Sequence, residues 1–493
     1  VISKVKPVAS GPVVRIPIMC LAASSALLRR WGKTTMLPSF IAQAPTTSLQ
    51  LYGFATSSRP PSSHRYHQYK ASEDRRIIAI KKCGDWKKAV ALANEIGVQQ
   101  GVTSLAAYNA AMGVCAQRRQ HAAAKALFDQ MKASGPKPTL VSYSQVMSAF
   151  ARTGRWKDAF ELLSVLEDID GLKPNVYILS NLITACQNGG KWGKSLEVFY
   201  SMQERWGVEP NTISFNAAIN ACAKGAQVDK ALELFHSMKV SDHGGDGGGV
   251  KPDIISFNSI ISACGKQNRW EKALEIFHSI EEYDGVEPDV IIFNATLMAC
   301  EKGGLSVKAL ELLQMMEERG LRPDVISYNA AISACDKAGN WETALELLAT
   351  MTEKRENGGV RPNIISLNAI ISACAKGGQI DESMKLLRLM EDEYGIPPDI
   401  ISFNAAISAC DKNGQWEEAL ELLNEMSKQG VRPNVFSFSA AISACGKGGE
   451  WEEAVKLLDS MEQRGVTPNA FCVGAAIRAC EKGGQWEAAL ALL

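Results

Sequence analysis

The stretch Pro-Asp-Val-Ile-Ser-Tyr-Asn-Ala-Ala-Ile-Ser-Ala-Cys, residues 323–335, decides the fold because close copies of it recur along most of the chain. Each copy begins with a proline, and these prolines are Pro138, Pro174, Pro210, Pro252, Pro288, Pro323, Pro362, Pro398, Pro433 and Pro468. Successive prolines are separated by 36, 36, 42, 36, 35, 39, 36, 35 and 35 residues. A period in this range is typical of solenoids, whose units pack only on their neighbours. The sequence therefore predicts stacked repeats over residues 105–493 and not one globular core.

Each repeat is predicted to form a hairpin of two antiparallel helices. We number a repeat from the residue after its Pro-Asp or Pro-Asn pair, or from the residue that aligns with it, which gives starts at Leu105, Leu140, Val176, Thr212, Ile254, Val290, Val325, Ile364, Ile400, Val435 and Ala470. In the repeat that begins at Val325, apolar positions 1, 4, 8 and 11 share one helical face. A second apolar stripe begins at Trp341, and a glycine and a proline then interrupt the chain. Because one hairpin cannot cover both stripes, we expect about eleven to stack, the last of them truncated.

The chain before the repeats has a different composition. Residues 1–72 contain nine Lys or Arg and no acidic residue, and they are rich in Ser, Ala and Thr. This composition is typical of a targeting segment for mitochondria or plastids, with a disordered tail as the plainer alternative. The remainder carries 53 acidic and 44 basic residues, a net charge of −9, so a general basic coat for nucleic acid is absent. Residues 73–104, with Trp86 in register, are predicted to form a degenerate repeat that caps the array.

Two other rows of residues recur and are predicted to pack in the core. Ten of the thirteen cysteines occupy position 11: Cys115, Cys186, Cys222, Cys264, Cys300, Cys335, Cys374, Cys410, Cys445 and Cys480. Packed helices lie about 8–10 Å apart, too far for disulfides between these rows, and no Cys-x-x-Cys pair offers zinc spacing. Tryptophan recurs at position 17, at the start of the second apolar stripe, where core packing is favoured over base stacking.

A second stripe on the first helix consists of positions 2, 5, 9 and 13, and it is not needed for the core. Position 2 is bulky and apolar in Tyr177, Ile213, Ile255, Ile291, Ile326, Ile365, Ile401 and Phe436. Position 5 is Asn or Ser in Asn109, Ser144, Ser180, Asn216, Asn258, Asn294, Asn329, Asn368, Asn404 and Ser439. Position 13 is lysine in Lys224, Lys266, Lys302, Lys337, Lys376, Lys412, Lys447 and Lys482.

Stacking would turn this stripe into a track of apolar, amide and ammonium rows. Such a track suits a polyanion, and apolar edges beside amides suit single-stranded bases. The acidic residues are expected on the second helices, at sites such as Glu342 and Glu346. Structural roles compete with this interpretation, because Asp or Asn before a helix is a good N-cap and Lys near a helix C-terminus complements the dipole. Neither explains Asn or Ser at position 5, inside the helix, where Asn has mediocre propensity.

A helical hairpin of about 35 residues that ends in Gly-Val-x-Pro-Asp/Asn, with Tyr/Phe-Asn at positions 4 and 5, resembles the pentatricopeptide repeat family, and the uniform repeat length is similar to its P class. This resemblance implies an all-α, right-handed superhelix of helix-turn-helix repeats that binds single-stranded RNA, one nucleotide per repeat. It also implies that position 5 and the last residue of the repeat choose the base, that position 2 sandwiches it, and that the position 13 lysine contacts phosphate.

The resemblance further implies a base for each repeat. Asn216 with Asp253, Asn258 with Asp289, Asn294 with Asp324, and Asn368 with Asp399 are expected to favour U. Asn329 with Asn363 and Asn404 with Asn434 are expected to favour C or U. Ser144 with Asn175, Ser180 with Asn211, and Ser439 with Asn469 are expected to favour A. The expected site is 5′-AAUUU(C/U)U(C/U)A-3′, and the pair of Asn109 with Thr139 is left unassigned.

Three functions remain open at this point. The favoured one is a binder of organellar RNA, in plastid or mitochondrion, that acts in RNA processing, mRNA stability or translation without catalysis, cofactor, metal or membrane. The second is a protein-binding scaffold similar to tetratricopeptide proteins, which would leave the Asn row unused. The third is the RNA-binding part of an enzyme whose C-terminal catalytic domain lies outside this chain. The six histidines form no metal motif.

Overall fold

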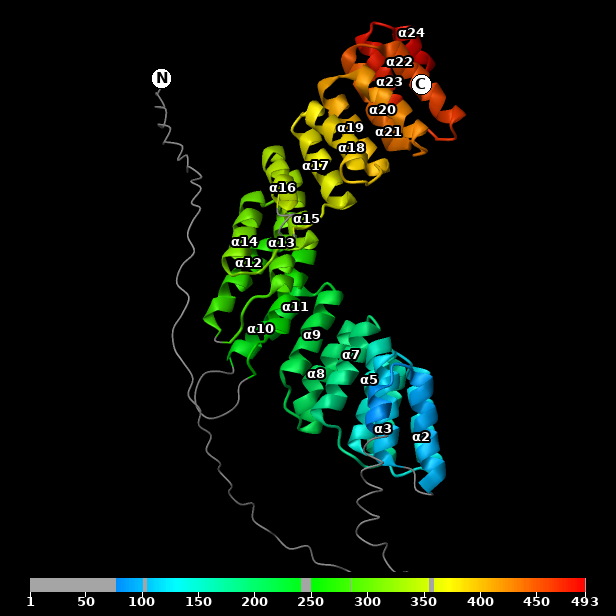
Figure 1. Ribbon diagram of the computed structural model, residues 1–493, viewed down its shortest axis with the longest axis vertical. Coiled ribbons are helices and arrows are strands. Elements are labelled where there is room, and N and C mark those ends of the chain that lie inside the picture. Colours follow the sequence, from blue (N-terminus) through cyan, green and yellow to red (C-terminus); the bar gives the residue numbers. More distant parts are fainter. Residues whose placement is uncertain (1–76, 101–103, 241–249, 284, 354–358, 493) are drawn as a thin grey trace, which may run out of the picture. The chain divides into compact units, whose positions relative to one another are not determined.

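The computed structural model describes residues 77–100, 104–240, 250–283, 285–353 and 359–492 (Figure 1). The predicted targeting segment, residues 1–72, lies outside the described residues. Within these ranges the chain forms helices and no strand, in eleven consecutive hairpins that follow α2 (Trp86–Gln100). The predicted all-α solenoid is confirmed.

The first helices of the hairpins begin where position 1 was assigned from the sequence. They are α3 (Leu105–Gln117), α5 (Leu140–Thr153), α7 (Val176–Asn188), α9 (Thr212–Lys224), α11 (Ile254–Lys266), α13 (Val290–Gly303), α15 (Val325–Ala338), α17 (Ile364–Lys376), α19 (Ile400–Asn413), α21 (Val435–Gly448) and α23 (Ala470–Lys482). The agreement at all eleven starts confirms the register on which every position number depends.

The second helices begin at position 17. They are α4 (His121–Ser134), α6 (Trp156–Ser164), α8 (Trp192–Trp206), α10 (Val228–Val240), α12 (Trp270–Ser279), α14 (Ser306–Glu318), α16 (Trp341–Glu353), α18 (Ile380–Asp392), α20 (Trp416–Lys428), α22 (Trp451–Gln463) and α24 (Trp486–Ala491). Short turns continue two of them, η1 (Val165–Ile169) after α6 and η2 (Ile280–Glu282) after α12.

The helix boundaries follow from their capping residues. Asp324, the residue before α15, has extended backbone, and its side chain accepts a hydrogen bond from the Ser327 backbone N–H. This N-cap satisfies a donor that the helix leaves unpaired. At the other end of α15, Gly339 adopts φ 74°, a left-handed conformation that glycine takes without steric cost. An Asp or Asn N-cap precedes every first helix from α7 to α23.

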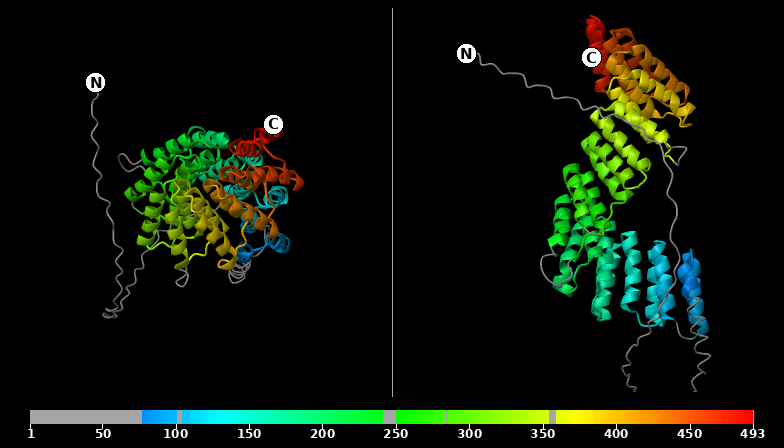
Figure 2. Two further views of the ribbon diagram at one scale, coloured as in Figure 1. Left: turned by 90° about the horizontal axis from the view of Figure 1, so that it is seen from above. Right: turned by 60° about the vertical axis from the view of Figure 1, so that its left-hand side comes forward.

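The first helices form one continuous layer. Each packs on the first helix of the next repeat, as α13 does on α11 and α15, whereas each second helix packs on its own first helix and on the first helix that follows (Figures 1 and 2). Residues such as Tyr328, Ile332 and Cys335 are buried between these layers. Positions 2, 5 and 13 of each repeat lie on helices of this first layer and so recur from one repeat to the next.

The cysteine row is part of this core. All ten position 11 cysteines are buried, and every cysteine in the described part of the chain is a free thiol. Burial raises the pKa of the Cys335 thiol to about 11 and that of Cys300 to about 12. These thiols are therefore protonated at neutral pH and behave as small apolar side chains.

The tryptophan row packs between repeats, as predicted, and it does so against glycine. A Cβ added to Gly303 would lie 2.8 Å from Trp270 Cδ1, and one added to Gly189 would lie 2.6 Å from Trp156 Cδ1. The six pairs of a position 17 tryptophan with a position 14 glycine of the next repeat are Trp156–Gly189, Trp192–Gly225, Trp270–Gly303, Trp341–Gly377, Trp416–Gly448 and Trp451–Gly483. Where position 17 is smaller, position 14 of the next repeat carries a side chain, as in Ser306 with Ala338.

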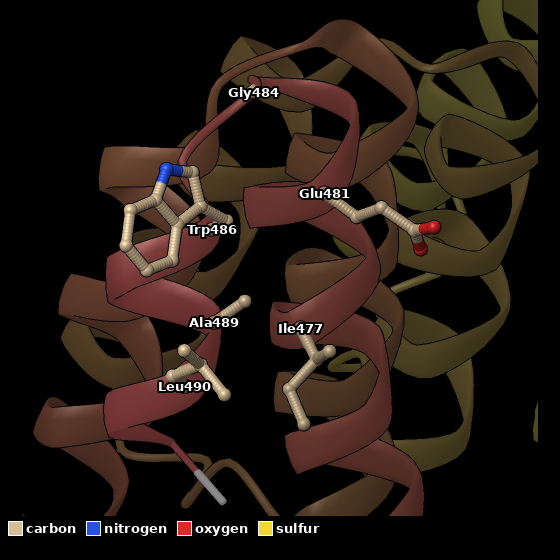
Figure 3. Close-up of a pocket in the computed structure, with 6 residues that line it drawn as sticks. All are labelled: Ile477, Glu481, Gly484, Trp486, Ala489 and Leu490. Atoms are coloured by element: carbon tan, nitrogen blue, oxygen red, sulfur yellow. The ribbon is translucent and has the colours of Figure 1, made fainter.

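Trp486 in the last hairpin shows the same ring without a following repeat. It is 66% exposed and lines a cavity of about 430 Å³ together with Ile477 and Leu490 (Figure 3). The six tryptophans that face a glycine are instead partly buried against the core. A position 17 ring is thus less exposed where it faces a position 14 glycine of another described repeat. A search of the described helices finds none long and apolar enough to cross a membrane.

Candidate nucleic-acid interface

A row of exposed apolar side chains runs along the first-helix layer at position 2. We define the apolar row as Val141, Tyr177, Ile213, Ile255, Ile291, Ile326, Ile365, Ile401, Phe436 and Phe471. Every member is more than half exposed, from 54% for Val141 to 74% for Phe436. Single exposed apolar residues are ordinary on protein surfaces, but a row with one member in each of ten consecutive repeats indicates a ligand surface. Val141 and Phe471 extend the row beyond the members expected from the sequence.

A network of polar side chains lies on the same helices. In the repeat that begins at Val290, the Asn294 Nδ2 group donates to Asp324 Oδ1 at 3.1 Å. The Ser327 hydroxyl donates to Asn294 Oδ1 at 2.6 Å. We define an amide triad as the position 5 Asn, the last residue of its repeat, and the Ser at position 3 of the next repeat. Five are present: Asn216–Asp253–Ser256, Asn294–Asp324–Ser327, Asn329–Asn363–Ser366, Asn368–Asp399–Ser402 and Asn404–Asn434–Ser437.

In each triad, the residue that ends the repeat is also the N-cap of the next helix, and a single side-chain oxygen serves both roles. Asp324 Oδ1 accepts from the Ser327 backbone N–H at 2.9 Å and from Asn294, whereas Asp324 Oδ2 takes part in none of the hydrogen bonds among the described residues. Burial acts to raise the pKa of Asp324, but the hydrogen bonds from Ser327 and Asn294 outweigh it and lower the pKa. The pKa of Asp399 is lowered in the same way by Ser402 and Asn368. Both carboxylates are therefore ionised at neutral pH.

The triads leave a defined pair of polar groups for a ligand. Where Asp is the last residue of the repeat, one amide N–H of the Asn and the carboxylate Oδ2 stay available to a ligand, as a donor beside an acceptor. The pairing edge of uracil offers a carbonyl oxygen beside an N–H, which is the complementary pair. With Asn363 or Asn434 at the end, the N-cap bonds engage the amide oxygen and leave N–H donors. An N–H donor from the residue that ends the repeat matches the bare ring nitrogen of cytosine.

The remaining position 5 residues expected to select bases are held differently. Asn258 makes no hydrogen bond with Asp289, and its oxygen accepts only from the Ser262 hydroxyl, at 3.4 Å. Ser180 reaches Asn211 through the Ser214 hydroxyl, to which it lies at 2.8 Å. The Ser144 and Ser439 hydroxyls donate to carbonyl oxygens of their own helices, those of Val141 and Phe436. In the structure, a direct hydrogen bond therefore joins five of the nine pairs that are expected to select a base.

A cavity of about 710 Å³ opens where the apolar and amide rows run together near the C-terminal repeats. Its walls include three successive members of the apolar row, Ile401, Phe436 and Phe471, with Asn404 and Ser439 between them. This volume lies within the roughly 300–1,000 Å³ of small-molecule pockets, so planar rings have room between the apolar side chains. The sequence-predicted sandwiching and base-selecting positions thus line one cavity.

The lysine row is partly neutralised, which corrects the expectation that acidic residues lie only on the second helices. Position 12 of the preceding repeat supplies acidic partners: Lys337 lies 3.2 Å from Glu301, and Lys376 lies 2.9 Å from Asp336. Lys447 makes a third such pair with Asp411, at 3.1 Å. These lysines keep 38–43% of their side-chain surface exposed, so the pairs are weak and open to exchange with a phosphate.

The other lysines of the row have different surroundings. Lys224 donates to Asn188 Oδ1 at 2.8 Å, and Lys412 donates to the Lys376 carbonyl at 2.9 Å. Lys302 lies 3.8 Å from its neighbour Glu301. Lys266 and Lys482 make no ion pair with the described part of the chain. All eight lie in the last turn of a first helix, so one face carries the whole row.

Two sets of residues at this face were missed by sequence reasoning. The position 3 serines are visible as a row in the sequence, but their partners lie on the preceding repeat, and no pattern within one repeat indicates this contact. The position 12 acids were missed because Glu301, Asp336 and Asp411 alternate with Ala and Gly in other repeats. No group of three metal-ligating side chains is found where the structure describes the chain.

Comparisons with known proteins agree with this architecture. Three family models match in turn along the array. They are described as "PPR repeat family" (residues 103–152, 362–410 and 398–447), "Pentatricopeptide repeat domain" (164–225, 245–302 and 311–377) and "PPR repeat" (141–169, 213–243, 291–321 and 436–466). Together these matches reach from residue 103 to residue 466. No curated protein sequence matches the chain.

Solved structures with similarity to this chain include the pentatricopeptide repeat protein PPR10 from maize, at 20% identity and a TM-score of 0.39, over 87% of this chain and 76% of that one. PPR10 in complex with an 18-nucleotide psaJ RNA element matches at 21% identity and a TM-score of 0.39, over 88% of this chain and 66% of that one. Yeast Rmd9p in complex with a 16-nucleotide target RNA matches at 13% identity and a TM-score of 0.35, over 83% of this chain and 94% of that one. On the family matches along its repeats, the chain belongs to the pentatricopeptide repeat family.

Proposed function

We propose that the array binds single-stranded RNA in a sequence-specific manner, one nucleotide per repeat. The observation that carries the proposal is the apolar row, whose members are at least 54% exposed, beside five amide triads that each retain unused polar groups. Flat apolar surfaces can stack on any base, whereas a donor and an acceptor at its edge discriminate among bases.

The expected bases follow from the pairs at position 5 and the end of each repeat. The site 5′-AAUUU(C/U)U(C/U)A-3′ remains the proposed target. Its U positions are supported by the donor beside an acceptor at Asn216–Asp253, Asn294–Asp324 and Asn368–Asp399, and its C/U positions by the donors at Asn329–Asn363 and Asn404–Asn434. The A positions, and the U assigned to Asn258 with Asp289, rest on the family resemblance alone.

We also propose that the protein acts by occupying organellar RNA, in a plastid or mitochondrion, in processing, stabilisation or translation. The basic, acid-free composition of residues 1–72 supports the compartment. Occupancy of a long single strand would block an exonuclease or hold a hairpin open, and neither effect needs a catalytic residue. Residues 73–104 are proposed to cap the first repeat, since α2 packs on α3.

The proposal is tested by the affinity of the purified chain for the nine-nucleotide site and for a site whose three consecutive U bases are replaced by G. Each misread base is expected to weaken binding by about 1–3 kcal/mol, by analogy with other nucleic-acid contacts. Asn294→Thr is expected to move the preference of its repeat from U toward G. Lys337→Ala is the matched control, expected to weaken binding to both RNAs alike. Equal affinity of the unaltered chain for both RNAs would contradict the proposal.

A further inference from the structure

The serine at position 3 links the two residues that are proposed to select a base. Ser256, Ser327, Ser366, Ser402 and Ser437 are fully buried. In the best example, the Ser327 hydroxyl donates to Asn294 Oδ1 at 2.6 Å and accepts from the Asp324 backbone N–H at 3.1 Å. A buried hydroxyl needs such partners, and here both lie on the preceding repeat. The base-selecting site of one repeat is thus completed by the next.

The serine and the aspartate together fix the direction of the amide. Asn294 Oδ1 faces the Ser327 hydroxyl, and Asn294 Nδ2 faces the Asp324 carboxylate at 3.1 Å. Turning the amide by half a rotation would place its oxygen against the carboxylate, which loses that bond and brings two acceptors together, and it would force the Ser327 hydroxyl to give up its present acceptor. The amide therefore presents a donor to a ligand, and only a donor.

The repeat that begins at Ile254 provides a natural comparison. It carries the same pair, Asn258 and Asp289, but position 3 of the next repeat is Ile292, which is buried and has no hydroxyl. Among the described residues, no hydrogen bond joins Asn258 to Asp289, and the Asn258 oxygen has a single contact, at 3.4 Å, with the Ser262 hydroxyl. An amide held this loosely can turn, and it can then offer either its N–H or its oxygen to a base.

We propose that the residue at position 3 of the following repeat is a positioning residue that sets how strictly the preceding repeat discriminates between U and C. This inference rests on the proposed RNA binding. A fixed donor matches the O4 carbonyl of uracil and opposes the N4 amino group of cytosine, whereas a turned amide accepts from that amino group. The repeat containing Asn294 therefore selects U strictly, and the repeat containing Asn258 tolerates C.

The experiment measures affinity for RNAs that carry U or C at the single base facing Asn294 or facing Asn258. The Ser327→Ala variant is expected to reduce the U-over-C ratio at the Asn294 base by about three- to tenfold, the worth of one hydrogen bond, while stacking and phosphate contacts persist. The Ile292→Ser variant is expected to raise the ratio at the Asn258 base. Ser142→Ala is the matched control, since Ser142 is equally buried but its hydroxyl bonds only to Thr139, in the repeat without an assigned base.

The U-over-C affinity ratio distinguishes a positioning role of the serine from a purely structural one. A purely structural serine would change the melting temperature and leave the ratio at both bases unaltered. Unchanged ratios in folded Ser327→Ala and Ile292→Ser variants would overturn the inference while leaving RNA binding intact. If Ser327→Ala does not fold, the Ile292→Ser arm decides alone. Equal affinity of the unaltered chain for the nine-nucleotide site and its three-G version would overturn the proposed function as well, so the two failures are distinguishable.

Discussion

The two junctions on either side of the hairpin α13–α14 are built from different chemistry. The apolar junction, where α13–α14 packs on α11–α12, has Ile292 buried at position 3 and Trp270 packed against Gly303. Its Asn258 and Asp289 side chains make no hydrogen bond with each other. Here the repeats are held by shape and apolar contact.

The polar junction, where α15–α16 packs on α13–α14, replaces these contacts with hydrogen bonds. Ser327 completes the triad with Asn294 and Asp324. At the far side of the junction, Asn340 donates to the Ser306 hydroxyl at 2.7 Å, where the apolar junction has Trp270. Both solutions stack the same hairpin on its neighbour.

Stacking of the repeats therefore does not require the triad. A repeat with Ile292 at position 3 is as regular as one with Ser327, and both helices begin at position 1. Five triads are nevertheless present along one face, next to the exposed apolar row. Their recurrence is better explained by a ligand than by the fold.

The largest effect is expected from Gly303→Ala in the apolar junction. The new methyl group would lie 2.8 Å from Trp270 Cδ1, closer than carbon atoms pack, so the ring or the helix must shift. Overpacking of this kind lowers the free energy of unfolding by about 1–3 kcal/mol. Circular dichroism would detect the loss as a lower midpoint of urea unfolding. In a Trp270→Ser background, which imitates Ser306 opposite Ala338, the same change should cost little. An equal loss in both backgrounds would contradict the Trp–Gly contact.

A smaller difference is expected between Asn294→Ala and Asn258→Ala. Asn294→Ala removes the hydrogen bonds that Asn294 makes with Ser327 and with Asp324, which costs about 1–2 kcal/mol of unfolding free energy. Asn258→Ala removes one long contact with Ser262 and should cost less than about 0.5 kcal/mol. Hydrogen exchange at the start of α15 and of α13 measures the two effects locally. A greater loss at Asn258 would reverse the contrast drawn between the junctions.

The lysine row should respond to its acidic partner in the polar junction. Glu301→Gln frees Lys337 and also removes the longer 3.8 Å contact of Glu301 with Lys302. The apolar junction has no acid at the equivalent place, because position 12 of its preceding repeat is Gly265. RNA affinity at low salt is expected to rise about two- to fivefold, the range for one exposed ion pair. Glu311→Gln on α14, where Glu311 pairs with Lys308, is the control and should leave affinity unchanged. A rise in both variants would indicate a general charge effect.

The smallest expected effect is a dependence of stability on pH in the acidic range. The pKa of Asp324 is lowered from its usual 3.8, so its stabilising contribution is complete above about pH 3.8 and is lost as the pH falls through the lower folded-state pKa. Carboxyl-carbon chemical shifts in a pH titration report this pKa directly. In Ser327→Ala the pKa should rise, because one of the hydrogen bonds to the carboxylate is removed. An unchanged pKa in that variant would show that the hydroxyl does not act on Asp324.

Periodicity was enough to predict the helical register, because each Asp or Asn N-cap is followed by apolar spacing that only a helix satisfies. All eleven first helices begin at the expected residues, from Leu105 to Ala470. The exposed apolar row and the polar choice at position 5 were also visible, since neither is needed by the core. The pairing of tryptophan with glycine could have been found by comparing position 17 with position 14 of the next repeat.

Contacts between repeats could not be predicted to the same extent. The link from Ser327 to Asn294 joins residues 33 apart in the sequence, and it depends on how closely two helices approach. The same holds for Lys337 and Glu301, 36 residues apart. Helical spacing gives the face on which a residue lies, but a hydrogen bond between faces depends on packing geometry that no single repeat contains.

A crystal structure of the chain bound to the nine-nucleotide RNA would test the proposed RNA surface most directly. We expect the base facing the Val290 repeat to lie between Ile291 and Ile326, with its pairing edge within hydrogen-bond distance of Asn294 Nδ2 and Asp324 Oδ2. The Asn294 amide should keep its bonds to Ser327 and Asp324. RNA bound along the second helices, or bases directed away from the apolar row, would contradict the central claim.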